Sequence, residues 1–315
     1  MIEKRIARLA RCCWRLAFGL ALGCASHPEP SARAPEPTGT PLPPGLALTV
    51  RVDLGSVRTE LGQDLARQVL LDALWREDSG GAPSLARPLL ARALAQSDVL
   101  WLGFPTIAQP EPASVLLLRG HFTSLEPTEP GARWSQDASG TATLELAGAE
   151  EGGYARIYRV PGDELLAWSP SSAQPAVERA LRQRTRQRVM QPPERGAVSI
   201  AASPEPLLER YAARYPELTE RFRGLRQLEA FAEPSAGAWR ADLTLDFDTP
   251  EHARDASLVA ERLREAIAKR SCAVGALARA LTISTFERNL RVQAALLGPE
   301  LDAVRNCVLG NGCCA

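Results

Sequence analysis

The chain has 315 residues, which is enough for one large domain or two of ordinary size. Hydrophobic residues make up 45% of it, a share typical of globular proteins, and this excludes a largely disordered chain. The 37 basic side chains balance 37 acidic ones. No excess of positive charge indicates nucleic-acid binding, so we expect no nucleic-acid partner.

The first 23 residues have the pattern of a secretion signal. Residues 1–15 carry five cationic side chains, and 16–23 form an uncharged apolar stretch that is too short to span a bilayer. The sequence Ala21-Leu22-Gly23-Cys24 resembles the lipobox of bacterial lipoproteins, in which the chain is cleaved before the cysteine and the cysteine is acylated. The resemblance implies a signal peptide over 1–23 and lipidation of Cys24. The alternatives are a signal peptide cut elsewhere and a cytosolic N-terminal helix.

Residues 24–45 predict an extended tether. Seven prolines lie between positions 28 and 44, and large apolar side chains are almost absent. Such a segment cannot form a core and favours polyproline II, which rises about 3.1 Å per residue. A folded body could therefore stand well away from a membrane to which Cys24 is anchored.

The first folded half is predicted over 46–190. Alternating apolar residues in LALTVRVDL indicate a half-buried strand over 46–54, and apolar residues every four positions indicate a helix over 57–73. A second helix is expected around 85–94. Further strands are expected at 98–104, 114–122, 141–146, 154–160 and 164–168, followed by a helix to about Arg184.

The second half is predicted over 196–310, after the break MQPPERG, with a cysteine-containing tail at 311–315. Strands are expected at 197–202, 225–232 and 238–248, with a helix over 204–222. Thr249-Pro250-Glu251 predicts a helix start, because threonine caps, proline suits the first turn and glutamate favours the helix dipole. Strands over 281–287 and 290–297 are expected to form a hairpin that turns at Arg288-Asn289.

Both halves are predicted to run strand, helix, strand pair, variable middle, hairpin and helix. The pattern predicts an α+β fold of two related halves of mostly antiparallel sheet, with helices packed on one face. In this layout the chain is similar to uncharacterised exported bacterial lipoproteins, a resemblance that implies no activity.

Catalytic and metal-binding motifs are sparse. The three histidines, His27, His121 and His252, form no HExxH or HxH motif, and the chain contains no GxSxG, Walker or GxGxxG sequence. The segment DLTLDFDTPEH places Asp242, Asp246, Asp248 and Glu251 close together, and these four carboxylates are weak candidates for a Ca²⁺ or Mg²⁺ site. A solvated strand face and an acidic first helical turn explain them better. We therefore expect no cofactor, no metal and no catalytic residue.

Four cysteines remain beyond Cys24. In an exported protein, Cys272, Cys307, Cys313 and Cys314 favour disulfides. A bond between the adjacent Cys313 and Cys314 would close a strained ring, so we expect Cys272 and Cys307 each to pair with one of them. A thiolate metal site is the alternative, but the sequence has no C-x-x-C spacing to support it.

Taken together, the sequence predicts a lipid-anchored protein of the cell envelope, at the outer membrane and facing the periplasm. Its expected role is non-catalytic binding or assembly with an envelope protein or glycan. The alternative is an envelope hydrolase or metal-dependent enzyme that uses the region from Asp242 to His252. A deep pocket in which His121 or His252 meets carboxylates would favour the enzyme, and a broad, shallow face would favour the binding protein.

Overall fold

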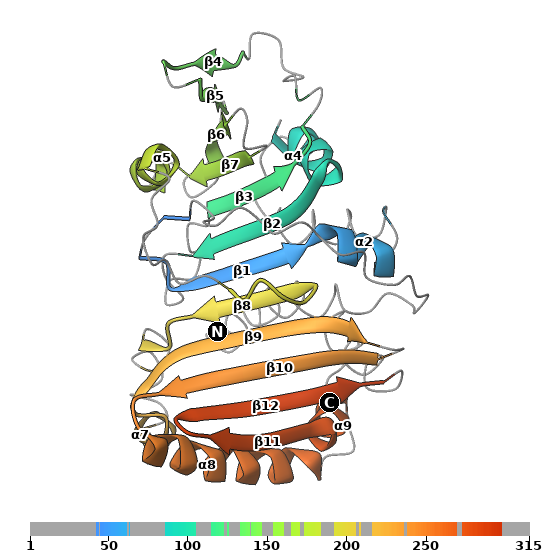
Figure 1. The fold of residues 1–315 in the computed structure, drawn as a ribbon, viewed down its shortest axis with the longest axis vertical. Helices are drawn as coiled ribbons and strands as arrows, with labels where there is room; N and C mark the ends of the chain where they lie inside the picture. Colours follow the sequence, from blue (N-terminus) through green and yellow to red (C-terminus); the bar gives the residue numbers. More distant parts are fainter. Residues whose placement is uncertain are drawn as a thin grey trace, which may run out of the picture.

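The computed structural model describes residues between 42 and 297, apart from 64–85, 105–114, 126–132, 147–153, 184–191, 209–215 and shorter stretches. The signal sequence, Cys24, most of the tether and the four remaining cysteines lie outside the described residues. The described chain forms one twelve-stranded sheet, in which every neighbouring pair of strands is antiparallel (Figure 1). The α+β class and the antiparallel sheet are therefore confirmed.

The strands run in the spatial order β11-β12-β10-β9-β8-β1-β2-β3-β7-β6-β5-β4. In the first half they are β1 (Leu48–Asp53), β2 (Ser97–Phe104), β3 (Val115–Gly120), β4 (Ser135–Gln136), β5 (Ala142–Glu145), β6 (Tyr154–Val160) and β7 (Leu165–Pro170). In the second half they are β8 (Val198–Ala202), β9 (Leu225–Ser235), β10 (Ala238–Phe247), β11 (Leu281–Phe286) and β12 (Asn289–Leu296). The helices are α2 (Leu54–Leu61), α4 (Ala86–Ala95), α5 (Gln174–Gln183), α7 (Pro216–Arg221), α8 (Pro250–Ala268) and α9 (Ala273–Ala280).

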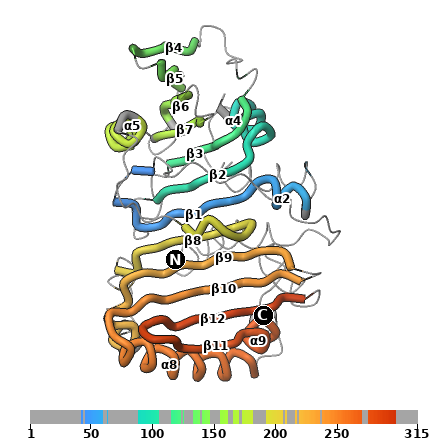
Figure 2. The backbone as a smooth tube through the Cα atoms, viewed as in Figure 1, coloured from blue at the N-terminus to red at the C-terminus, as the bar shows by residue number. Residues whose placement is uncertain are grey.

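The strand order is equivalent in the two halves of the sheet. From the centre outward, the first half runs β1-β2-β3-β7-β6 and the second runs β8-β9-β10-β12-β11. β1 and β8 pair at the centre, so the two halves extend in opposite directions from this pair (Figure 2). The hairpins β6–β7 and β11–β12 occupy equivalent places. This topology supports the expectation of two related halves, and their common origin stays a prediction.

β1 differs from the half-buried strand that the sequence predicts. Val50 and Val52 are buried on one side, as expected, but Thr49, Arg51 and Asp53 are buried on the other side as well. On that side Arg51 lies between Ser199 of β8 and Trp101 of β2, which are buried as well. The local alternation of apolar and polar residues could not predict that β1 is buried on both faces.

One face of the sheet carries most of the described helices. α2 and α4 pack their leucines and alanines over the inner side chains of β1, β2, β3 and β7. α8 packs over β10 and β12 through Ala253 and Ala256, which contact Phe247 and Leu290 in a separate cluster. The expected start of α8 is confirmed, since the Thr249 hydroxyl accepts a hydrogen bond from the His252 backbone N–H. None of the described helices is both long and apolar enough to cross a bilayer.

α5 packs on the opposite face, which differs from the expectation that all helices share one face. Val177 and Leu181 of α5 contact Trp101, Leu117 and other residues that point away from α2 and α4. The Tyr158 hydroxyl also donates to Glu178 of α5 at 3.0 Å. The side chains of a strand alternate between the two faces, and in the first half both sets are apolar, so both faces need cover.

The β11–β12 turn lies one residue earlier than the sequence predicts. Glu287 and Arg288 form the two-residue loop, and Asn289 pairs with Phe286 as the first residue of β12. Glu287 takes the positive φ, at 51°. This register determines which side chains of β11 and β12 point to each face of the sheet.

Candidate functional site

The second half of the sheet presents a regular array of polar side chains on the side opposite α8. We call this array the polar face. The aligned strand pairs place its side chains in four rows across β9, β10, β12 and β11. The rows are Glu233-Arg240-Ala295, Phe231-Asp242-Gln293-Thr282, Glu229-Thr244-Arg291-Ser284 and Gln227-Asp246-Asn289-Phe286.

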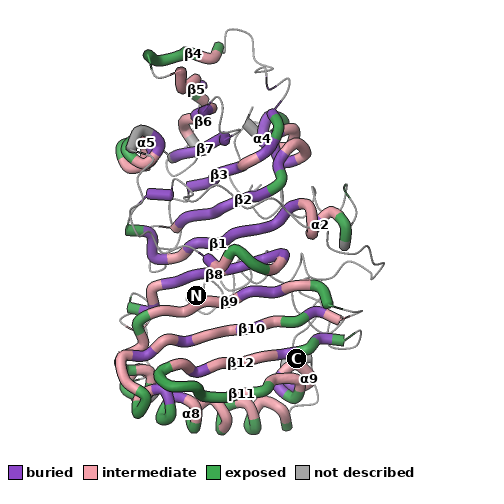
Figure 3. Tube along the Cα trace, viewed as in Figure 1, coloured by how far each residue is buried: buried purple, intermediate pink, exposed green. Residues whose placement is uncertain are grey.

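The polar face lies on the same side of the sheet as α5. From Asp242, one row crosses Phe231 and then continues through Ser199, Arg51, Trp101, Leu117, Ala167 and Tyr158. The row is apolar where α5 covers it and polar over β9–β12, where no described helix packs against it. Strands β1, β2, β3 and β7 of the first half are accordingly more buried than β9–β12, as Figure 3 shows. In the described part of the chain, the polar face is the broad uncovered surface of the sheet.

Asp242 is the centre of a hydrogen-bonded cluster on this face. Its side chain is fully buried. The Arg291 Nε–H donates to both Asp242 oxygens, at 3.0 and 2.8 Å, the Arg291 Nη2–H donates to Oδ2, and the Gln293 amide donates to Oδ2 at 2.8 Å. Burial alone would raise the pKa of Asp242, but the hydrogen bonds from Arg291 and Gln293 outweigh burial, so the pKa is lowered. The bond to Asp242 also raises the pKa of Arg291. This carboxylate is thus committed to an ion pair within the sheet.

The four candidate metal ligands do not converge. Asp242 and Asp246 share a strand face as predicted, but four residues of strand separate their Cα atoms by about 14 Å. Asp246 accepts from Arg288 at 2.9 Å, and Glu251 pairs with Arg254 at 3.6 Å. Asp248 lies beyond the end of β10. No group of three or more potential metal ligands occurs among the residues that the structure describes.

Asp248 instead forms a pair with His252 in the first turn of α8. Its carboxylate oxygen lies 2.6 Å from His252 Nδ1, and both side chains are about one-third exposed. Gly224, at φ +77°, makes room for the pair, because a Cβ there would lie within 3.0 Å of both side chains. The hydrogen bond from His252 lowers the pKa of Asp248. The histidine that the sequence singled out therefore meets one carboxylate at the surface, outside the polar face.

We expect the Asp248–His252 pair to make the stability of the fold decrease at low pH. Since the pKa of Asp248 is lower in the folded chain than its ordinary value of 3.8, its stabilising contribution is complete above that value. The contribution is lost as the pH falls through the folded-state pKa. Melting temperatures of the Asp248→Asn variant and the unaltered chain should therefore differ at neutral pH and converge in acid, once the pH is below the folded-state pKa of Asp248. An equal difference at every pH would contradict this account.

His121 takes no part in the same site. It follows β3, where its backbone N–H donates to the Gln96 carbonyl, and its side chain is exposed. Four strands, β2, β1, β8 and β9, separate β3 from β10 in the sheet. At about 4.8 Å per strand, His121 and the Asp242–His252 region are more than 20 Å apart. The two histidines therefore cannot cooperate in one catalytic centre.

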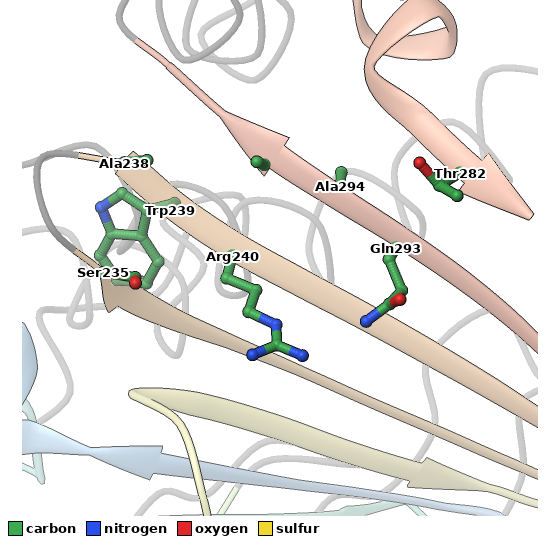
Figure 4. Close-up of a pocket in the computed structure, with 8 residues that line it drawn as sticks. Ser235, Ala238, Trp239, Arg240, Thr282, Gln293 and Ala294 are labelled. Atoms are coloured by element: carbon green, nitrogen blue, oxygen red, sulfur yellow. The ribbon is translucent and has the colours of Figure 1, made fainter.

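A shallow depression of about 380 Å³ lies at one end of the polar face. Its polar lining comes from Ser235, Arg240, Thr282 and Gln293, and its apolar lining includes Trp239 and three alanines. Figure 4 shows Arg240 and Gln293 extending from the neighbouring strands β10 and β12 toward the same side. Its described lining supplies hydrogen-bond donors and hydroxyl groups, and among these residues no nucleophile is paired with a base. It suits binding better than covalent chemistry.

Sequence reasoning identified Asp242 and missed its partners. Arg291 and Gln293 are 49 and 51 residues away along the chain. The available signal was the alternation in NLRVQAAL, where Arg291 and Gln293 share one side of a strand. This alternation predicts that Arg291 and Gln293 lie on the same face of β12, but it does not predict that β12 pairs with β10.

Comparison with known proteins gives a likeness in fold alone. No protein-family model matches the chain, and no curated protein sequence matches it. Among solved structures, three crystal forms of TP0453 are similar. Form III has a TM-score of 0.48 at 10% identity, covering 84% of this chain and 94% of that one. Form I has a TM-score of 0.48 at 11% sequence identity, covering 85% of this chain and 96% of that one. Form IV has a TM-score of 0.49 at 10% sequence identity, covering 84% of this chain and 94% of that one.

Proposed function

We propose that this protein is a lipid-anchored component of the cell envelope that binds another envelope component without catalysing a reaction. Acylated Cys24 would hold it in the bilayer, and residues 25–45 would act as the tether. We place it at the outer membrane, with the folded body in the periplasm. In that oxidising compartment Cys272, Cys307, Cys313 and Cys314 would form two disulfides.

The observation that carries the binding role is the open polar face. It spans four strands, and hydrogen bonds hold several of its side chains, including Asp242, Arg291 and Gln293. No described helix covers it, whereas α5 covers the same side of the first half. A broad face of this kind, with a shallow depression at its end, has the form of a binding surface. The carboxylates of the alternative enzyme pair separately with Arg291, Arg288, His252 and Arg254. Among the described residues, these four pairs do not converge on one centre.

Site-specific photo-crosslinking in intact cells tests the binding surface. A photoreactive phenylalanine at Ser284, an exposed position of the polar face, should capture an envelope component after irradiation. The matched control carries the same residue at Glu265, an exposed position on α8, which packs on the other side of the sheet. Capture that is no stronger at 284 than at 265 would contradict the proposal.

Metabolic labelling tests the anchor separately. A clickable fatty acid should label the unaltered chain, and the Cys24→Ser variant should lose the label and leave the membrane fraction. A label that persists in the variant would show that another residue is acylated. An unlabelled chain with its start methionine intact would contradict the lipoprotein assignment.

A further inference from the structure

We infer that the ligand of the polar face is an uncharged, polyhydroxylated glycan chain that lies across β9, β10, β12 and β11. This inference rests on the proposed binding role of that face and adds the chemical class of the ligand. Four properties of the face lead to it: its charge balance, its rigidity, its exposed aromatic ring and its composition.

The charges of the polar face cancel. Its four acidic side chains, Glu229, Glu233, Asp242 and Asp246, are accompanied by Arg240, Arg291, Arg288 and Arg195. Arg195 reaches the face by stacking on the Phe231 ring at 3.9 Å. Because opposite charges are interspersed, the face exerts no strong net attraction on a polyanion or a polycation. A ligand without formal charge fits this balance.

The hydrogen-bonding groups of the face are held in place before any ligand arrives. Arg291 and Gln293 are fixed by Asp242, and the Gln227 amide donates to Glu229 at 2.8 Å. Side chains fixed in this way lose little conformational entropy on binding. The partly exposed groups of Gln227, Glu229 and Arg291 can still bond to ligand hydroxyls through their remaining donors and lone pairs, whereas the buried Asp242 carboxylate only holds its partners in place. This is the chemistry that recognises a polyol.

An aromatic ring stands at the edge of the face without a packing role. Phe286 is 72% exposed, and the pairing of β11 with β12 places it in the row of Asn289 and Asp246. Thr282, which lines the depression, lies four residues away on the same strand, about 14 Å along it. The apolar ring faces of sugars can stack on such a side chain while their hydroxyls reach the polar rows. A glycan chain could thus extend from the ring of Phe286 to the depression.

The composition of the face disfavours a protein partner. The cores of protein interfaces are depleted in glutamate, aspartate and serine and enriched in aromatic residues, methionine and arginine. On the polar face, acidic, amide and hydroxyl side chains predominate, and Phe286 is its one strongly exposed aromatic residue in the described chain. A hydrophilic ligand matches this surface better than a protein does.

A glycan array tests the ligand class. The mature, acylated chain in detergent would be applied to an array printed with neutral and acidic oligosaccharides. We expect selective binding to neutral members that resists added sodium chloride, since no ion pair forms with the ligand. Phe286→Ala should weaken this binding at least about fivefold. Leu258→Ala, a truncation at a 60% exposed position of α8, should leave it unchanged.

Three outcomes would overturn the inference: binding to acidic members only, equal binding by the Phe286→Ala variant, and no binding to any member of the array. The proposed function is tested apart from this result. Crosslinking at Ser284 to an envelope protein would leave the binding role standing while removing the glycan as its ligand. Absence of crosslinking at Ser284 would contradict the binding role itself.

Discussion

Replacing Arg291 with methionine is expected to lower the free energy of unfolding by about 2–3 kcal/mol. The substitution leaves the fully buried Asp242 carboxylate with the Gln293 amide as its close hydrogen-bond donor and with Arg240, 3.9 Å away and half exposed, as its remaining ion-pair partner. Breaking a buried pair by removing one partner costs about 3–5 kcal/mol, and we take a lower figure because the Arg291 side chain is 40% exposed and partly screened. Urea unfolding at neutral pH would measure the loss.

A second substitution shows whether Arg291→Met loses stability because the Asp242 charge is left unpaired or because side-chain packing is lost. In the Asp242→Asn/Arg291→Met double variant no buried carboxylate remains, so we expect it to recover at least half of the stability that Arg291→Met loses. If the double variant loses as much free energy of unfolding as the two single variants lose together, the unpaired charge is not the cause of the instability.

The stability that Arg291→Met loses should depend on pH. In the unaltered chain the lowered pKa of Asp242 makes its contribution complete above its ordinary value of 3.8, and acid removes that contribution. In Arg291→Met the effect of burial, which raises the pKa, loses its main opposition. The stability deficit of the variant should therefore shrink as the pH falls. A deficit that is constant with pH would contradict this reading.

Gly120→Ala is expected to destabilise the fold by about 2–3 kcal/mol. Gly120 ends β3 beside the irregularity between Ser97 and Val99 of β2. A Cβ at this position would lie within 3.0 Å of the Gln96 carbonyl and the Ser97 Cα, both of which are backbone atoms. Relief would require β2 and β3 to separate at the place where the His121 N–H bonds to the Gln96 carbonyl.

Gly103→Ala is the matched control for Gly120→Ala. Gly103 also lies in a strand of the first half, but the closest atoms to its added Cβ belong to the Leu46 side chain, which can rotate away. We expect a loss of about 1 kcal/mol or less there. Similar losses in the two variants, measured by urea unfolding, would contradict the view that backbone crowding makes Gly120 irreplaceable.

The local part of the candidate site was predictable and the non-local part was not. Alternation in DLTLDF correctly places Asp242 and Asp246 on one strand face, and Thr249-Pro250 correctly predicts the start of α8. Asp248 was wrongly grouped with them, because the strand ends one residue earlier, at Phe247. The hydrogen bonds between Asp242 and Arg291 connect β10 to β12, and α8, α9 and β11 lie between these strands in the sequence. Periodicity within a short stretch of sequence cannot predict a contact between such distant residues.

The sequence by itself determined the antiparallel α+β class, the positions of most described strands and the N-terminal cap of α8, because periodicity and capping are short-range effects. Only the tertiary structure decided that β1 lies at the centre of the sheet, that α5 covers the side opposite α8, and that Arg291 neutralises Asp242. These features depend on which strands become neighbours. Strand pairing depends on how much apolar surface the whole sheet buries. Which face of the sheet stays open therefore depends on residues that are far apart in the sequence.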